Sequence, residues 1–276
     1  MRDASSLNAG DNGRVEVQQA CTVLYRELPA LDPGALGARL RPAVGAARVE
    51  WAAPSRSGLP LTAGLARFGP HRIAMIALDA PVKDEVLDRT VRVSPMPEDL
   101  RGEMLRHQAA IRLLYVGDAP EPGEQLAALY LLAGALLRDG GLGVLNERAA
   151  LAQPAELVEH YLSELGAGPL PLPLWVGVVT FSAEGNGSKR YLMRTYGMEQ
   201  FGQPELAIYF GDQANADGVY HTLLNVGLYL IEAGPGLQIG PGHTAEFMRR
   251  TYLFTEPQED TPELSGPTGV LVLIEV

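Results

Sequence analysis

The sequence contains a single cysteine, Cys21, in a chain of 276 residues. One cysteine cannot form an internal disulfide bond, which fits a reducing compartment. Cys21 lies in the apolar run ACTVLY, so we expect a buried, inert thiol rather than a reactive nucleophile.

Long apolar runs are also absent. The longest is LAALYLLAGALL, 12 residues from Leu126 to Leu137, whereas crossing a bilayer takes roughly 20. We interpret this run as a buried core helix. The first residues lack the apolar core of a signal peptide, so residues 1–14 are expected to form a disordered tail. These features predict a soluble, cytoplasmic protein that does not enter a membrane.

Basic residues are scarce relative to acidic ones. The chain has 22 Lys and Arg against 33 Asp and Glu, a net charge of −11. Such a charge repels nucleic acid phosphates and anionic lipid surfaces. It favours a basic protein partner, although solubility alone explains it equally well.

Familiar catalytic motifs are missing as well. The sequence has neither the G-x-S-x-G of a serine hydrolase nor the G-K-[ST] of a phosphate-binding loop. Glu156, His160 and Glu164 fall on one face of a predicted helix, a spacing that metal sites use. No second motif supplies further ligands, so a solvated helix face is the better interpretation. We predict no metal, no cofactor and no catalytic residue.

What the sequence does contain is a series of strand and helix patterns. The expected strands are 15–28, 47–53, 72–82, 109–116, 143–146, 174–182, 191–196, 205–210, 246–255 and 270–276. The expected helices are 33–40, 97–107, 122–138, 153–165 and 215–233, with one or two helical turns within 83–91. Residues 54–70, rich in Ser, Gly and Pro, are expected to form a long connection.

This order predicts an α+β fold with a mixed, largely antiparallel sheet packed against helices, and two ferredoxin-like halves are one arrangement it permits. The expected domains are a strand-helix-strand unit at 15–70 and a main α+β domain at 71–276. A single continuous domain from 15 to 276 is the alternative. The apolar final strand 270–276 is expected either at the centre of a sheet or at a dimer contact.

The densest specific stretch is YLMRTYGMEQFGQPELAIYF, residues 191–210. We interpret it as strand, turn and strand. Gly197 and Gly202 permit positive φ or close backbone approach, Phe201 fills core, and Pro204 fixes entry to the second strand. This pattern favours a structural motif over a reactive centre.

Five polar residues near this stretch are candidates for a binding site. Arg194 and Glu205 either pair across the hairpin, or Glu205 holds a buried network. Tyr196 lies between them in sequence. The helix at 215–233 is apolar almost all round and therefore predicted to be buried, so His221 and Asn225 must face a network, a cleft or an interface.

Three pieces of sequence carry a family resemblance: LPLW at 172–175, RTYGM at 194–198 and FGQPEL at 201–206. They resemble a bacterial family described as domain of unknown function 4261, with the likeness running roughly from His71 to Phe247. The resemblance implies a compact α+β domain and bacterial origin. It implies no activity and no catalytic residues.

Two functions of different class follow from these observations. The first is a non-enzymatic binding or accessory protein, of the immunity type, whose acidic surface neutralises a basic partner. The second is a small-molecule sensor or enzyme with a cleft near 191–232, lined by Arg194, Tyr196, Glu205, His221 and Asn225. The oligomeric state does not follow from the sequence.

Overall fold

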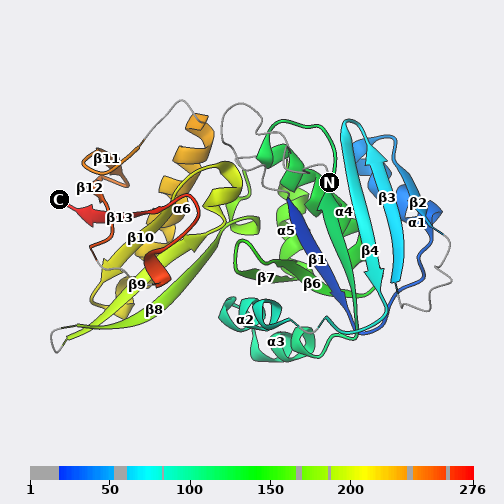
Figure 1. The fold of residues 1–276 in the computed structure, drawn as a ribbon, viewed down its shortest axis with the longest axis horizontal. Helices are drawn as coiled ribbons and strands as arrows, with labels where there is room; N and C mark the ends of the chain where they lie inside the picture. Colours follow the sequence, from blue (N-terminus) through cyan, green and yellow to red (C-terminus); the bar gives the residue numbers. More distant parts are fainter. Residues whose placement is uncertain are drawn as a thin grey trace, which may run out of the picture.

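The computed structural model describes residues 19–52, 61–82, 84–165, 170–185, 188–234, 239–258 and 262–276. Two β-sheets organise this part of the chain, with the first sheet and its helices at one end of the molecule and the second sheet at the other (Figure 1). The expected tail at 1–14 and the Asn186-Gly187 turn lie outside the described residues.

The first sheet has seven strands in the order β2-β3-β4-β5-β1-β6-β7, and all neighbours are antiparallel. Its strands are β1 (Ala20–Tyr25), β2 (Arg48–Trp51), β3 (Leu61–Phe68), β4 (His71–Leu78), β5 (Ala109–Tyr115), β6 (Gly141–Asn146) and β7 (Leu151–Pro154). The central strands β4, β5, β1 and β6 have the spatial order of one ferredoxin-like unit, and a helix follows β1 and β5 as in that unit, but two further helices stand between β4 and β5 where it has a hairpin. The strands β2 and β3 extend that unit at its edge.

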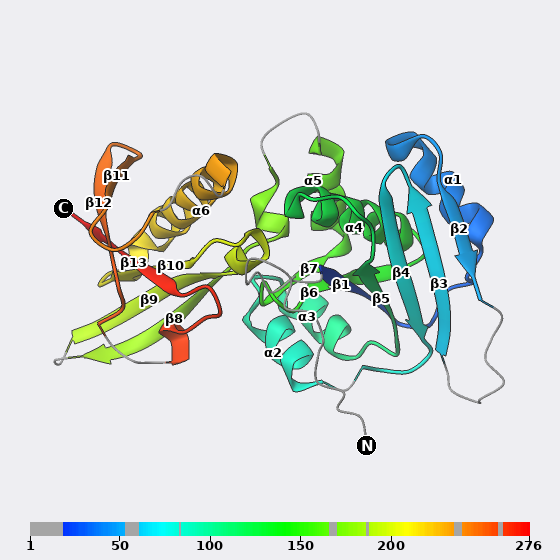
Figure 2. The same cartoon turned by 45° about the horizontal axis from the view of Figure 1, so that its top comes forward.

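Helices cover this sheet on both faces. They are α1 (Pro33–Val44), α2 (Glu85–Val93), α3 (Glu98–Leu105), α4 (Pro122–Leu137) and α5 (Ala155–Glu164). The largest hydrophobic core lies between α1, α4 and the odd-numbered side chains of β1, β4 and β5, such as Val23, Ile111 and Leu113. The opposite face carries Leu24 and Ala110, which pack against α2 and α3 (Figure 2).

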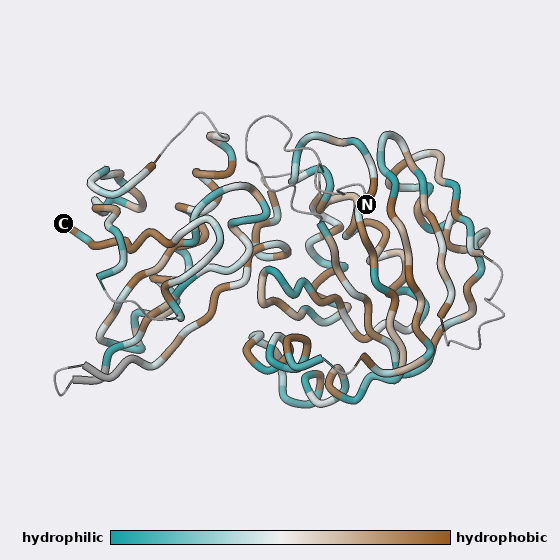
Figure 3. Tube along the Cα trace, viewed as in Figure 1, coloured by the Kyte–Doolittle hydropathy of each residue, from teal (hydrophilic) through white to brown (hydrophobic). Residues whose placement is uncertain are grey.

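The second sheet has six strands in the order β11-β12-β13-β10-β9-β8. They are β8 (Gly177–Gly185), β9 (Ser188–Tyr196), β10 (Glu205–Phe210), β11 (Thr244–Phe247), β12 (Arg250–Thr255) and β13 (Val270–Glu275). The central pair, β10 and β13, is parallel because α6 (Ala216–Ala233) and a hairpin separate the two strands in sequence. Helix α6 covers one face of this sheet, and apolar residues run along the central strands of both sheets (Figures 1 and 3).

The predicted α+β class is confirmed: the helices pack on two mostly antiparallel sheets. The final strand β13 lies between β12 and β10, so it is central in its sheet. Of the two ferredoxin-like halves that the sequence allowed, the first sheet contains strands in the order of one such unit. The second sheet, with its parallel pair, has a different order.

Three predicted segments were wrong. Part of the expected connection at 54–70 is the strand β3. Gly64 lies within this strand, and its lack of a side chain leaves room for the Trp51 ring. The strand β7 precedes α5, where only helix was expected. The expected strand 246–255 is the hairpin β11–β12, which turns at Met248 and Arg249 with φ of 52° and 65°. Two consecutive non-glycine residues with positive φ leave no turn signature in sequence.

The expected domain boundary at residue 70 lies in the turn between β3 and β4, which are hydrogen-bonded neighbours in the first sheet. In chain order, the elements of the first sheet end with α5 and those of the second sheet begin with β8. Three short 3₁₀ turns relevant to the site follow this point: η1 (Leu172–Leu174), η2 (Met198–Phe201) and η3 (Gln213–Asn215).

The long apolar run forms α4, which is buried against the first sheet as predicted. Among the described residues, no helix has both the length and the apolar character that crossing a bilayer requires.

Cys21 is predicted to be unreactive in the folded protein. Burial raises the pKa of its thiol to about 12, against a smaller lowering by Arg112. We expect no labelling by 5,5′-dithiobis(2-nitrobenzoate) at pH 8 in buffer, because the thiolate is the reactive form. In denaturant one thiol per chain should react. Rapid labelling without denaturant would contradict the buried position.

Candidate functional site

Glu205, the first residue of β10, is 3% exposed and holds a buried hydrogen-bond network. Its carboxylate accepts hydrogen bonds from the Thr195 hydroxyl at 2.6 Å and from the Gly197 backbone N–H at 2.9 Å. Burial raises the pKa of Glu205, while Thr195 and the nearby Arg194 guanidinium act in the opposite direction. The carboxylate therefore fixes the end of β9 and the turn after it.

Arg194 is 2% exposed, and its guanidinium is hydrogen-bonded to backbone carbonyls. Its guanidinium donates to the carbonyl oxygens of Glu263 and Ser265, the latter at 3.0 Å. It also lies 4.2 Å from the centre of the Tyr196 ring, a cation–π contact. Arg194 thus anchors the loop that leads into β13. Of the two roles considered for this pair, pairing across the hairpin or a buried network held by Glu205, the hydrogen bonds fit the network, while the anchoring of a loop by Arg194 was not anticipated.

Gly197 has φ 103° and ψ −1°, a conformation that side-chain-bearing residues rarely adopt. A Cβ at this position would also lie 2.7 Å from the Trp175 carbonyl oxygen. Both the conformation and the close approach therefore require glycine. The predicted structural role of Gly197 has this physical basis.

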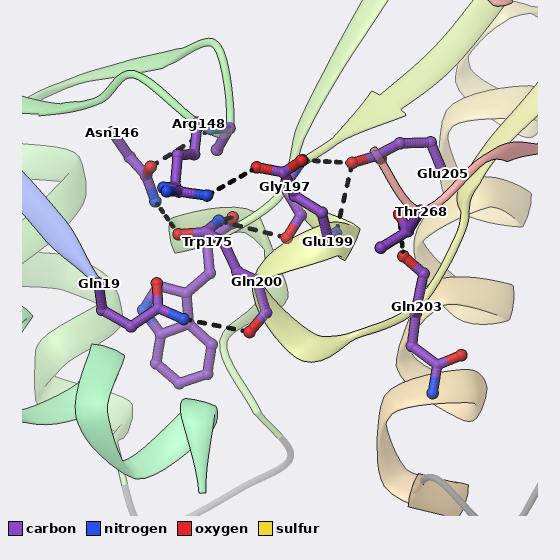
Figure 4. A network of polar contacts seen from close by, with 11 residues as sticks. Gln19, Asn146, Arg148, Trp175, Gly197, Glu199, Gln200, Gln203, Glu205 and Thr268 are labelled. Carbon is purple, nitrogen blue, oxygen red and sulfur yellow. Dashed lines mark hydrogen bonds and ion pairs between the residues drawn. The ribbon is translucent and has the colours of Figure 1, made fainter. Parts of the chain in front are cut away.

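Gln200, in η2, joins the two sheets (Figure 4). Its side-chain amide donates to the Trp175 carbonyl at 3.0 Å and accepts from Asn146 of the first sheet at 3.3 Å. Its backbone carbonyl accepts from the Gln19 side chain at 3.1 Å. Beside it, Arg148 and Glu199 form an ion pair at 3.0 Å. One turn thus contacts three segments of the first sheet and its connections.

The remaining motif residues complete this turn. Phe201 packs against the cores of both sheets. Gly202 has φ 71° and caps the end of η2, and Pro204 directly precedes β10. The Thr268 hydroxyl donates to the Gln203 carbonyl at 2.8 Å, which ties the turn to the segment before β13 (Figure 4).

His221 and Asn225 lie apart from this network, on the exposed side of α6. Arg194 is opposite Ala207 in the β9–β10 ladder, and Ala207 packs on the sheet face away from α6. The five predicted binding residues therefore do not share one cavity. The expectation that α6 is buried all round was also wrong, because its polar stripe faces solvent.

That exposed side of α6 is called the outer face below. It consists of Asp217, His221, Asn225, Tyr229, Glu232 and, from the β11–β12 turn, Met248. The Asn225 amide donates to the Met248 sulfur at 3.4 Å, which links the helix to the hairpin turn. Tyr229 packs edge-on against Phe247, with ring centres 5.4 Å apart. Tyr229 is 45% exposed and Met248 59% exposed, so the face presents apolar surface between polar groups.

A cavity of about 770 Å³, called the C-terminal cleft below, opens between the first turns of α6 and the ends of β10, β12 and β13. Its lining includes Gly218, Thr222, Met248, Arg250 and Glu275. Arg194, Tyr196, Glu205, His221 and Asn225 do not line it. A cleft thus exists near the expected region 191–232, but with different residues.

The helix stripe weighed as a metal site lies on α5. Glu156 and His160 are both exposed. In the part of the chain that the structure describes, no group of three or more His, Cys, Asp or Glu side chains is placed to hold a metal ion.

Sequence reasoning missed the residues of the cleft because they come from distant segments. Arg250 and Glu275 form an ion pair at 2.8 Å across neighbouring strands, although 25 residues separate them in sequence. Gly218 lies near the start of a predicted helix. Because glycine lowers helix stability, its presence there could have indicated a position where a side chain would occupy needed space.

A comparison with protein families confirms the resemblance expected from the sequence. Residues 194–274 match the family described as Domain of unknown function (DUF4261). The match begins in β9 and includes β10, α6 and the strands β11, β12 and β13, so it extends beyond Phe247 and starts well after His71. No curated protein and no solved structure matches the chain.

Two glycine substitutions should distinguish the energetic cost of a positive φ from the cost of a steric clash. Gly197→Ala must adopt positive φ and also displace a backbone oxygen, so we expect a loss of more than about 3 kcal/mol in the free energy of unfolding. Gly202→Ala also has positive φ, but its Cβ meets no atom within 4 Å. It should cost only about 1–2 kcal/mol. Urea denaturation measures both, and equal losses would contradict the crowding at Gly197.

Glu205 should make stability depend on pH. Its pKa in the folded protein is raised, so its contribution is fully present below the ordinary glutamate pKa of about 4.3 and is lost as pH rises through the folded value. Glu205→Gln should flatten this part of the pH profile in urea denaturation. Glu205→Leu, which leaves buried donors unsatisfied, should cost more than about 2 kcal/mol.

The matched control is Glu246→Gln, which changes an exposed carboxyl on β11. It should leave the pH profile unchanged. A Glu205→Gln profile that parallels the unsubstituted protein would show that Glu205 does not titrate differently on folding.

Proposed function

We propose that this chain is a non-enzymatic binding protein of the immunity or accessory type, which recognises a basic protein partner. The observation that carries the proposal is the outer face of α6, where Tyr229 and Met248 are exposed between carboxylates. Aromatic residues and methionine are enriched in protein interfaces, and interface energy concentrates in a few such side chains.

Charge supports a basic partner. Asp217 and Glu232 lie at the two ends of the outer face, and the whole chain carries −11. Complementary charge speeds association and selects among partners more than it adds affinity. Arg249, exposed and next to Met248 in sequence, places an opposing charge beside this face. A partner whose lysine or arginine side chains lie near the two ends of α6 would keep its positive charges away from Arg249.

Preorganisation supports the same surface. The Asn225–Met248 hydrogen bond and the Tyr229–Phe247 contact hold the hairpin turn against α6 before any partner binds. A surface that is already ordered loses less conformational entropy on association. The buried Arg194 and Glu205, in contrast, are engaged in structural contacts, which supports binding rather than catalysis for this region.

A second function is favoured by the C-terminal cleft. Its volume of about 770 Å³ lies within the usual range for small-molecule sites, roughly 300–1,000 Å³. A sensor whose ligand occupies this cleft is therefore the alternative. We place either function in the cytoplasm, because the single buried cysteine is suited to a reducing compartment.

The partner proposal is tested by capture of proteins from the native host, followed by affinity measurement over a salt series. We expect binding that weakens as salt rises. Tyr229→Ala, and separately Asp217→Lys with Glu232→Lys, should each raise Kd at least about tenfold, which corresponds to roughly 1.4 kcal/mol.

The control is Glu156→Lys with Glu159→Lys, which makes the same charge change as the double variant at two exposed positions on α5. It should leave Kd within about threefold, or roughly 0.7 kcal/mol. Absence of any partner, salt-insensitive binding, or equal weakening by the Glu156 and Glu159 double variant would overturn the proposal.

A further inference from the structure

The C-terminal cleft arises where the two central strands of the second sheet diverge. The parallel strands β10 and β13 pair from Glu205 with Val270 to Ala207 with Val272. Beyond these residues β10 pairs with β9 alone, and β13 pairs with β12 alone, among the described strands. Crevices at the carboxyl ends of parallel strands, where the chain leaves in different directions, are common ligand sites.

The cleft is lined by apolar and polar side chains in similar measure, and its apolar part comes from several elements. Ile208 and Phe210 come from β10, Tyr252 from β12, Leu273 from β13, and Val219 from α6. The helix passes over the opening of the sheet, and Gly218 places no side chain in the space. A ligand with an apolar body of moderate size would replace water along these walls.

The cleft also contains charges of both signs in equal number. Arg250 and Glu275 form an ion pair whose side chains are 60% and 53% exposed. Arg190 and Glu256 line the same cavity, and the Arg190 guanidinium lies 5.8 Å from the centre of the Tyr209 ring. Two arginines and two glutamates therefore surround one apolar space.

We propose that the C-terminal cleft binds a zwitterionic ligand of the amino acid class, with a large apolar side chain. The carboxylate of such a ligand is complementary to arginine, and its ammonium group to glutamate. The apolar side chain fills the space beside Val219 and Leu273. An apolar ligand that carries only a negative charge would pair with the arginines and leave the glutamates without a partner on the ligand. A ligand that carries only a positive charge would do the reverse.

The balance of charges decides between these ligand classes. Both side chains of the Arg250–Glu275 pair are more than half exposed, so a singly charged ligand that displaced their contact would leave one partner hydrated but without its counter-charge, a loss of complementarity rather than a large desolvation cost. A zwitterion replaces both halves of that contact. Met248 borders both the cleft and the outer face, but the charged groups invoked for the zwitterion differ from those invoked for the basic partner.

Gly218 allows the site to be filled without disturbing the fold. A Cβ on Gly218 would meet no atom within 4 Å, and the residue lies in the first turn of α6 with ordinary helical geometry. Gly218→Leu extends a side chain into the cleft, whereas Gly218→Ala has the same effect on helix propensity with little added volume. The two variants form a matched pair.

The test uses isothermal titration calorimetry with three probes that share the phenylethylamine skeleton: L-phenylalanine, N-acetyl-L-phenylalanine and 2-phenylethylamine. We expect L-phenylalanine to bind at least tenfold more tightly than either analogue, each of which lacks one charge. Gly218→Leu should weaken binding at least tenfold, and Gly218→Ala less than threefold. Glu275→Gln should weaken L-phenylalanine binding while leaving the N-acetyl compound unchanged, with Glu246→Gln as the exposed control.

The proposal is overturned if none of the probes binds, if the three bind equally, or if Gly218→Leu retains full affinity. Partner binding reports separately on the proposed function: Gly218→Leu should leave it intact, and Tyr229→Ala should leave L-phenylalanine binding intact. Failure of one assay with success of the other therefore identifies which of the two proposals is wrong.

Discussion

The turn from Gly197 to Gly202 passes between the two sheets, and the whole arrangement depends on the backbone of Gly197. Its positive φ directs the N–H toward the Glu205 carboxylate at 2.9 Å and brings the chain against the Trp175 carbonyl. The next residues then contact both cores, Met198 in the second and Phe201 in both. A side chain at Gly197 would strain all of these contacts at once, because protein interiors have little free space.

The hydrogen bonds of this turn show how polar residues can stabilise the fold without taking part in chemistry. Gln200 satisfies backbone and side-chain groups from Trp175, Asn146 and Gln19. Buried polar groups are stable only when they find partners, so this network admits few alternative arrangements of the two sheets. Arg194 and Glu205 act in the same way within the second sheet. Their charge is offset by carbonyls, a hydroxyl and backbone N–H groups.

Much of the fold was predictable because local patterns agree with tertiary structure. Asp32 and Pro33 begin α1 as predicted, with the Asp32 carboxylate accepting from the backbone of Gly34 and Ala35. The apolar run from Leu126 to Leu137 is a buried helix, and Gly197 and Gly202 have positive φ. Where pattern and burial coincide, the sequence alone was sufficient.

The rest depended on long-range contacts. Nothing local reveals that Met248 and Arg249 adopt positive φ, or that β3 follows a stretch rich in Ser, Gly and Pro. Alternation along β9 and β10 separates residues onto opposite faces, but the face covered by α6 is decided by the sheet order. The candidate residues Arg194 and His221 were therefore grouped by sequence distance, which carries no information about the side of the sheet.

The boundary of family similarity has a consequence for modularity. The matched region starts at Arg194, yet β9 begins at Ser188 and pairs along its length with β8, which precedes it. Gly197 also packs against Trp175, outside the matched region. A segment cut at the limits of similarity would leave an unpaired strand and an uncovered turn. The region of family similarity is therefore not a self-contained structural unit of this chain, because its first strand and its turn depend on residues that precede it.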